Sequence, residues 1–330
     1  MLNFPQEFFQ EEVREDFTVD VTMKTFWAAE MEVLREVSEI CERHGLQWYC
    51  AYGTLLGAVR HQGFVPWDDD MDIWMLREDY NRFLEVAEAE LPRGYVVQSP
   101  MLEEGYTEYH TMVLNAKSIS ISQERLQKFH GCPFAVGIDV FPLDYLPREE
   151  EDRQTMMEFM ALMSMIVGII QKEEWKEKDI EDIVNGRNAL SDFFGVNFEV
   201  EIKKENQKKL QCEIFRLANY LAMSYGEADG DDLVLYFSYL MNPRKRFPKE
   251  CFADVEMMPF EVFWVPVPCG YEEVLRRQYG DYMKRVRNAA AHDYPIYEKQ
   301  VKALREAKDD FEGKCKRLEE LLAKQKEKKC

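Results

Sequence analysis

The sequence predicts an α/β fold, a mixed twisted sheet flanked by helices, with a helical C-terminal region. Three observations support this prediction. Residues 20–44 repeat apolar side chains at helical spacing and are followed by Gly45, which suits a helix C-cap. Short apolar and aromatic segments, typical of strands, then alternate with helical patterns up to about residue 141. From residue 149 onward, long helical patterns dominate.

The first half of the chain is expected to contain most of the sheet. Apolar runs bounded by turn residues predict strands at 46–52, 70–76, 95–98, 109–115, 118–122 and 137–141. Further helices are expected at 55–61 and at 79–91, with Asp79 as the cap of the second. The helix at 55–61 follows a Gly-Thr turn, so its N-terminus would face a bound phosphate.

The second half of the chain reads as mainly helical. Helices are expected at 156–172 and 205–225, and a strand pair is expected at 250–255 and 261–267. The highly charged residues 298–330 predict a solvated amphipathic helix, which is a candidate dimer element. We therefore divide the chain into a core of residues 1–150, a mainly helical region of residues 151–297 and a C-terminal helix of residues 298–330.

Composition excludes several classes of protein. The formal net charge of −20 opposes binding to nucleic acid, whose phosphates are bound through lysine and arginine. Eight cysteines without CxxC spacing predict reduced thiols and a cytoplasmic protein. The acidic N-terminus lacks the basic and apolar regions of a signal peptide. The apolar run at 156–170 is shorter than the ~20 residues that cross a bilayer, so we expect a buried methionine-rich helix.

The acidic segment at 66–73 is the most informative feature of the sequence. On a strand, Asp70 and Asp72 would point to one face, with Met71 on the other. Two carboxylates on one face repel each other unless a cation lies between them. A hard cation with oxygen ligands suits such a pair, Mg²⁺ first and Mn²⁺ as the alternative. Asp68 and Asp69 are expected only to shape the loop.

A third carboxylate is expected to complete this site. Asp139 is a lone charge within the β-branched run at 136–141, where charges are rare unless they have a role. If its strand lies beside the strand of Asp70 and Asp72, three carboxylates would converge. Such a set holds the metal ions that assist phosphoryl displacement. The competing interpretation, a solvated acidic turn and a structural aspartate, is disfavoured by the ordered set of residues around it.

These residues resemble the nucleotidyltransferase superfamily, with Thr54 in place of the more usual serine. The motif consists of Gly53-Thr54, Gly57, Arg60, Asp70-x-Asp72 and the strand residue Asp139. More specifically, residues 53–73 closely resemble the LicD family of phosphotransferases. That family includes bacterial phosphorylcholine transferases and is similar to the fukutin-type ribitol-phosphate transferases. The resemblance is dense over about residues 25–145 and thin to about residue 295.

The resemblance implies a nucleotidyltransferase-like fold with residues 1–150 as the catalytic core and residues 151–297 on the acceptor side. It implies a CDP-linked donor, typically CDP-choline, whose phospho-alcohol passes to a sugar hydroxyl of a cell-surface glycan, such as lipopolysaccharide or teichoic acid, or its precursor. Asp70, Asp72 and Asp139 would be the metal ligands, and Asp139 would also take the proton of the acceptor. A lipid-linked acceptor would bring the protein to the cytoplasmic face of the inner membrane as a peripheral protein.

The remaining site residues follow from the same resemblance. Gly53, Thr54 and Gly57 would cradle the donor phosphate. Arg60 and His61 would neutralise the transferred phosphate, although a structural histidine is the alternative for His61. Lys117 is also a candidate for phosphate binding, against the alternative of a surface lysine. His292 falls where the family tends to carry a histidine, but its surroundings depart from the family, so its role stays open.

Two other functions remain open at this point. A glycosyltransferase could use the Asp-x-Asp pair to hold a nucleotide-sugar donor, and a scaffold protein could retain the acidic residues as structure. The transferred alcohol is also open among choline, ethanolamine and ribitol, as is the acceptor glycan. A choline group would need an aromatic cage. The aromatic residues near the motif are Tyr52, Trp67, Trp74 and Tyr109, and the sequence does not choose among them.

Overall fold

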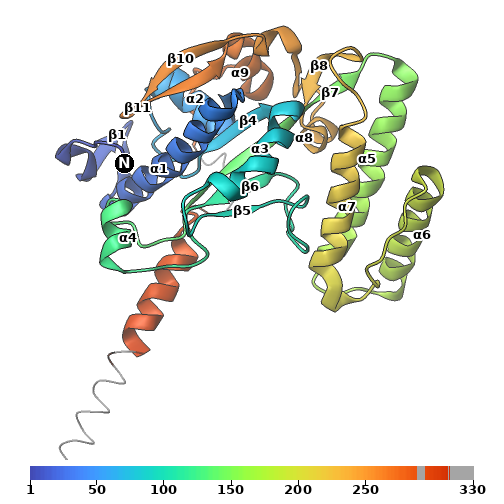
Figure 1. The fold of residues 1–330 in the computed structure, drawn as a ribbon, viewed down its shortest axis with the longest axis horizontal. Coiled ribbons are helices and arrows are strands. Elements are labelled where there is room, and N and C mark those ends of the chain that lie inside the picture. Colours follow the sequence, from blue (N-terminus) through green and yellow to red (C-terminus); the bar gives the residue numbers. More distant parts are fainter. Residues whose placement is uncertain (288–293, 311, 313–330) are drawn as a thin grey trace, which may run out of the picture.

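The centre of the fold is a mixed sheet in which two neighbouring strands run parallel (Figure 1). The computed structural model describes residues 1–287, 294–310 and 312. The main strands, in spatial order, are β3 (Trp48–Cys50), β4 (Asp72–Leu76), β7 (Gly137–Pro147), β6 (Thr111–Leu114) and β5 (Val96–Gln98). The parallel pair is β4 and β7, and β8 (Gly230–Val234) and β9 (Arg246–Pro248) extend the sheet from the far half of β7. The predicted mixed α/β fold is therefore confirmed.

The long helix α1 (Val21–His44) anchors the core against this sheet. Asp20 caps its start by accepting a hydrogen bond from the Met23 N–H at 2.8 Å, and Gly45 ends it in the left-handed conformation. Trp27 is fully buried and stacks on Phe64 with ring centroids 4.4 Å apart. The same core holds α2 (Tyr52–His61), α3 (Arg77–Glu90) and α4 (Gln123–Lys128). The predicted helix at 20–44 is confirmed.

Two hairpins and a short helix complete the core. The hairpins are β1 (Glu12–Arg14) with β2 (Phe17–Val19) and β10 (Val255–Phe260) with β11 (Phe263–Pro268), and helix α9 (Tyr271–Tyr279) follows the second. Short 3₁₀ helices lie at η1 (Gln6–Phe9), η2 (Lys204–Asn206) and η3 (Lys249–Phe252). The buried Tyr49 hydroxyl donates to the Phe252 carbonyl at 2.6 Å, which ties the second hairpin region to the sheet.

A second hydrophobic cluster lies among the helices beyond β7 and β8. It is built from α5 (Glu150–Ile170), α6 (Glu177–Phe194), α7 (Gln207–Ala222) and α8 (Tyr236–Met241). Figure 1 shows the three longer helices side by side at one end of the molecule. The division of the chain at residue 150 stays a prediction, and the two buried clusters do not follow it, because the first also includes residues such as Phe260 and Leu275.

Helix α5 contains the apolar run that the sequence analysis interpreted as a buried helix. At 21 residues, it is the one helix within the described residues that is long and apolar enough to cross a membrane, judged by length and composition alone. One face, including Met156, Met160 and Met163, packs into the second cluster against α6 and α7. A third of its most apolar window is buried, so the expectation of a buried helix holds for that face only.

Several predicted elements differ from the structure. Residues 118–122 form no strand, because Ser122 caps α4 and the Ser120 hydroxyl bonds locally instead of leaving the backbone to a ladder. The strand expected at 250–255 starts only at its last residue, since 249–252 form η3. Helix α6 was not predicted, and β7 runs six residues beyond the predicted strand. Residues 298–310 are helical as predicted, while 313–330 and any dimer contact there lie outside the described residues.

Candidate active site

The parallel pairing of β4 and β7 places Asp72 directly opposite Asp139. The Asp139 N–H donates to the Met71 carbonyl at 3.0 Å, which fixes this register one residue before β4 begins. Neighbours in register on adjacent strands point to the same face of a sheet. Asp72 is 7% exposed, and the Asp139 side chain is 24% exposed. The predicted juxtaposition of the two carboxylate-bearing strands is therefore confirmed.

Three further carboxylates lie in the loop that precedes β4. One oxygen from each of Asp68, Asp69 and Asp70 lies within 4.8 Å of the others, a group that can hold a metal ion. Asp70 thus lies before the strand rather than on it, because β4 begins at Asp72. The buried Asp69 also accepts a hydrogen bond from the Ile296 N–H at 2.6 Å, which ties the C-terminal segment to the loop. The contact of Asp69 with Ile296 agrees with the loop-shaping role expected for it, and a metal-binding role for Asp68 and Asp69 would be additional.

Glu30 of α1 is a carboxylate that the sequence analysis missed. It is 1% exposed, and its Oε2 has no hydrogen-bond partner within the described residues. Burial raises the pKa of Glu30 well above its ordinary value, and the carboxylates of Asp70, Asp69, Asp68 and Asp72 raise it further. The sequence contains a sign of this burial, because Glu30 lies three residues after Trp27 and four before Leu34, on the apolar and buried side of the helix.

Asp68, Asp69, Asp70, Asp72 and Asp139 together form what we call the acidic site, and Glu30 lies beside it on α1. Burial raises the pKa of Asp72 well above its ordinary value, and the neighbouring Asp70, Asp139 and Asp68 add to the shift. Within the described residues, no lysine or arginine forms an ion pair with Asp72. The donors are all carboxylate oxygens, which suit a hard divalent cation rather than a soft metal. The acidic site therefore fits a bound cation, which would relieve the repulsion among these charges.

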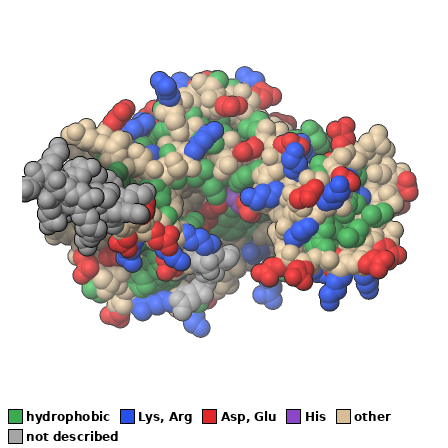
Figure 2. Space-filling model, turned by 90° about the horizontal axis from the view of Figure 1, so that it is seen from below, with side chains coloured by type: hydrophobic (Ala, Val, Ile, Leu, Met, Phe, Trp, Pro, Cys, Tyr) green, Lys and Arg blue, Asp and Glu red, His purple; other side chains and the backbone are tan. Residues whose placement is uncertain are grey.

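His110 is a second residue that sequence reasoning missed. Its Nε2 lies 3.2 Å from Asp139 Oδ2, as an electrostatic contact outside good hydrogen-bond alignment, and its ring packs against Phe141 at 4.4 Å. Burial alone would lower the pKa of His110, but the charge and proximity of Asp139, helped by Glu108, raise it overall. The only signal in the sequence was its place at the start of a predicted strand. Figure 2 shows a hollow between the sheet and the helical part, with acidic and histidine side chains inside it.

Gly53 and Thr54 shape the acidic site. The buried Thr54 hydroxyl accepts a hydrogen bond from the Asp72 N–H at 2.8 Å, so it fixes the start of β4. A Cβ atom at Gly53 would lie 1.9 Å from Asp68 Oδ2, so glycine leaves room for the carboxylate in the position that it has here. Helix α2 starts at Tyr52, three residues earlier than predicted, and the Asp68 carboxylate lies near its N-terminus, where negative charge is favoured.

Gly57, Arg60 and His61 have packing partners in the structure. A Cβ atom at Gly57 would lie 2.3 Å from the Gly63 carbonyl oxygen, which explains the glycine by close backbone approach. Arg60 donates to the Tyr282 carbonyl at 2.8 Å, and burial lowers its pKa. His61 Nε2 lies 3.5 Å from a Glu15 carboxylate oxygen, and burial followed by the charge of Arg60 lowers its pKa. Their contacts with a phosphate stay predictions.

The other predicted residues lie at varied distances from the acidic site. Lys117 is exposed in the loop after β6 and forms no ion pair with the part of the chain that the structure describes. His292 falls outside the described residues. The Tyr52 ring packs against Trp74 at 5.1 Å, close to Asp72 on β4. By contrast, Tyr109 packs against Phe215 and Phe237 in the second cluster, and the Trp67 indole donates to the Val286 carbonyl.

Comparison with known proteins assigns the region that carries these residues. Residues 45–160 match the family described as LicD/FKTN/FKRP, nucleotidyltransferase domain. The chain contains a LicD-type nucleotidyltransferase domain. The lipopolysaccharide cholinephosphotransferase LicD of Haemophilus influenzae is 27% identical over 258 residues, which cover 77% of this chain and 88% of that protein. The predicted resemblance is thereby confirmed.

Other relatives match shorter stretches of the chain. The ribitol 5-phosphate transferase FKRP of human and mouse is 35% identical over 75 residues, which cover 23% of this chain and 14% of those proteins. An uncharacterised protein of Rickettsia typhi is 34% identical over 67 residues, 20% of this chain and 22% of its own length. The similarity to LicD and FKRP supports a phosphotransferase. Asp72, His110 and Asp139 lie inside the matched domain, whereas Glu30 lies before it.

Proposed function

We propose that this protein transfers a phospho-alcohol, phosphocholine first, from a CDP-linked donor to a sugar hydroxyl of a cell-surface glycan or its precursor. The observation that carries the proposal is the parallel register that sets Asp72 opposite Asp139 inside a LicD-type domain. The name of the Haemophilus relative, a lipopolysaccharide cholinephosphotransferase, supports both the choline and the glycan.

The carboxylates would have different roles, metal binding and proton acceptance, according to their exposure. Asp70, Asp72 and Asp139 would hold Mg²⁺, or Mn²⁺, which when bound neutralises charge on the donor phosphates. Asp139, the more exposed member of the strand pair, would accept the proton of the acceptor hydroxyl, with His110 holding its carboxylate in place. The hydroxyl oxygen forms a bond to the phosphorus that carries the alcohol, and the bond from that phosphorus to the departing CMP breaks.

The surroundings of the acidic site support this arrangement of partners. The hollow beside the helical part gives a glycan acceptor access, and residues 151–297 would shape that side (Figure 2). We place the reaction in the cytoplasm, with peripheral contact at the inner membrane face when the acceptor is lipid-linked. The net charge of −20 opposes nucleic acid as a partner.

A donor panel tests the proposal. Purified protein is incubated with Mg²⁺, candidate glycans and either CDP-choline, CDP-ethanolamine, CDP-ribitol or nucleotide sugars, and the released nucleotides are identified by mass spectrometry. We expect CMP from a CDP-alcohol, and no CMP after chelation of the metal or in Asp72→Asn. Release of a nucleoside diphosphate from a nucleotide sugar, with no CMP from any CDP-alcohol, would contradict the proposal and identify a glycosyltransferase.

A further inference from the structure

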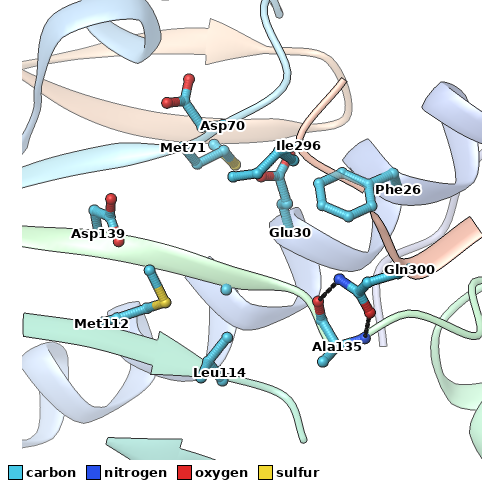
Figure 3. A pocket seen from close by; sticks show the side chains of 11 residues that line it. Phe26, Glu30, Asp70, Met71, Met112, Leu114, Ala135, Asp139, Ile296 and Gln300 are labelled. Carbon is cyan, nitrogen blue, oxygen red and sulfur yellow. Dashed lines mark hydrogen bonds between the residues drawn. The ribbon is translucent and has the colours of Figure 1, made fainter. Parts of the chain in front are cut away.

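A cavity of about 180 Å³ lies against one side of the acidic site (Figure 3). Asp70 and Asp139 line its edge, so it adjoins the carboxylates assigned to the donor phosphates. This volume is several times what a single water needs, so the cavity has room for a compact organic group. The remaining walls are mainly apolar and come from α1, β6 and the C-terminal segment, with Phe26, Met112, Leu114 and Ile296 among them.

Glu30 reaches this cavity from α1 (Figure 3). Its side chain is almost fully buried, and its Oε2 lacks a hydrogen-bond partner within the described residues. No ion pair between Glu30 and a lysine or arginine is present in that part of the chain either. Burying a carboxylate without a partner is costly. A cation bound in the cavity would supply the missing partner.

The walls of the cavity disfavour a polyol. Each buried hydroxyl of ribitol would need a hydrogen-bond partner, and hydrocarbon and thioether side chains provide none. Gln300 also lines the cavity, but its amide already donates to the Ala135 carbonyl at 2.8 Å and accepts from the Ala135 N–H at 2.9 Å. Glu30 is the lining side chain whose carboxylate oxygen has no hydrogen-bond partner within the described residues, so it is left to a ligand. An aromatic face such as that of Phe26 attracts organic cations.

We propose that this cavity binds the cationic head of the transferred alcohol, with Glu30 as its counter-charge and Phe26 as an aromatic wall. The inference rests on the proposed function, since it assumes that the donor phosphates lie at Asp70 and Asp139. It selects an amino-alcohol such as choline or ethanolamine over a neutral polyol. Glu30 is then a determinant of donor specificity that lies outside the matched domain.

Binding measurements without acceptor test the inference. Titration calorimetry with Mg²⁺ compares CDP, CDP-choline, CDP-ethanolamine and CDP-ribitol. We expect the wild-type protein to bind CDP-choline about tenfold more tightly than CDP, because the head adds a cation–π contact and a charge pair. CDP-ribitol should bind with nearly the same affinity as CDP. In Glu30→Gln, the gain for CDP-choline should disappear while the Kd for CDP stays within about twofold.

Two further variants test whether a loss of affinity for CDP-choline comes from the charge of Glu30, from the space in the cavity or from a general loss of structure. Leu114→Phe narrows the cavity but keeps Glu30. It should therefore reduce the affinity for CDP-choline, relative to that for CDP, more than the affinity for the smaller CDP-ethanolamine. Glu36→Gln removes a carboxylate from the same helix, where it pairs with Arg35 away from the cavity, and should change neither Kd. Melting temperatures measured in parallel show whether each variant is folded.

The possible outcomes separate this inference from the proposed function. If wild-type protein binds CDP-ribitol as tightly as CDP-choline, or if Glu30→Gln and Leu114→Phe keep the choline preference, the head group binds elsewhere and the inference is wrong. If Glu30→Gln weakens CDP and CDP-choline equally, Glu30 acts on the phosphates, and the inference is also wrong. If no CDP compound binds wild-type protein, the proposed function itself fails.

Discussion

The strand pair β4 and β7 carries a buried carboxylate at each of its ends, and the two ends differ in whether an arginine is paired with it. At one end, Asp72 and Asp139 face each other without a lysine or arginine partner in the described structure. At the other end, Arg77 follows β4 and binds both oxygens of Asp144, at 2.6 and 2.8 Å, while Asn219 accepts a third hydrogen bond at 3.0 Å. One end is therefore compensated by an arginine, whereas at the other end Asp139 has His110 at 3.2 Å and Asp72 has no basic side chain paired with it in the described structure.

The difference distinguishes structural charge from functional charge. Burial alone would lower the pKa of Arg77, but the charge and hydrogen bonds of Asp144 raise it, so Arg77 stays charged. Around Asp72, burial and like charges act together to raise the pKa of that carboxyl. The buried pair of Arg77 and Asp144 joins α3, β7 and α7. Buried carboxylates that repel one another are typical of sites that a ligand completes.

The largest effect should come from removing a carboxylate of the Asp72–Asp139 pair. Asp72→Asn or Asp139→Asn should lower the rate of CMP release about 10³-fold or more, because metal-assisted charge neutralisation contributes several kcal/mol. Stability without metal should be equal or higher, since repulsion is relieved. Asp231→Asn, which removes an exposed carboxylate that pairs with Arg148, is the matched control and should stay active. An active Asp139→Asn enzyme would falsify its role as ligand and base.

At the end where Arg77 pairs with Asp144, a substitution should lower the free energy of unfolding rather than the rate of CMP release. Arg77→Met leaves Asp144 buried without its partner and should cost about 3–5 kcal/mol of unfolding free energy. Adding Asp144→Leu should restore much of this loss, because the isolated charge is then removed as well. Urea unfolding followed by circular dichroism measures both. A cost below about 1 kcal/mol for the single variant would show that water or other groups already compensate Asp144.

A smaller effect is expected at the residue that positions Asp72. Thr54→Val removes the hydroxyl that accepts the buried Asp72 N–H, and an unsatisfied buried donor costs about 1–3 kcal/mol. Thr54→Ser keeps the oxygen and should stay close to wild type. Urea unfolding measures the stability, and CMP release shows whether misplacing Asp72 also affects turnover. Equal stability of the valine and serine variants would argue against this hydrogen bond.

The smallest effect concerns pH. The pKa values of Asp72 and Glu30 are raised in the folded state, so their contribution favours folding at low pH and is lost as pH rises from their ordinary values through the raised ones. Bound Mg²⁺ should counter this loss. Added Mg²⁺ should therefore raise the melting temperature by a few degrees at pH 8 and less at pH 5. In Asp72→Asn, this dependence should be weaker; an identical dependence would place the metal elsewhere.

The sequence was sufficient to predict residues whose role shows in local pattern. Asp139 stood out as a charge in a β-branched run, and its pairing with the strand of Asp72 is observed. Helix α1 was predicted from spacing and caps, and its ends agree closely.

Residues whose role depends on tertiary neighbours could not be predicted in the same way. Glu30 looks like one of many helix glutamates until α1 packs its stripe against the acidic loop. His110 gains its meaning only when β6 pairs with β7 and brings it to Asp139. Conversely, Gly57 resembles a phosphate-cradling glycine by motif, yet its close approach to Gly63 gives it a packing reason.

The contact between Gly53 and Asp68 has a consequence for recognising related sequences. The Asp68 carboxylate lies where a side chain at Gly53 would begin, so a relative with alanine at the first position would have to turn or shorten the acid at the second. The two positions are therefore coupled through the orientation of one short side chain. In an unfamiliar sequence, glycine with an acid at this spacing is compatible with the loop geometry described here.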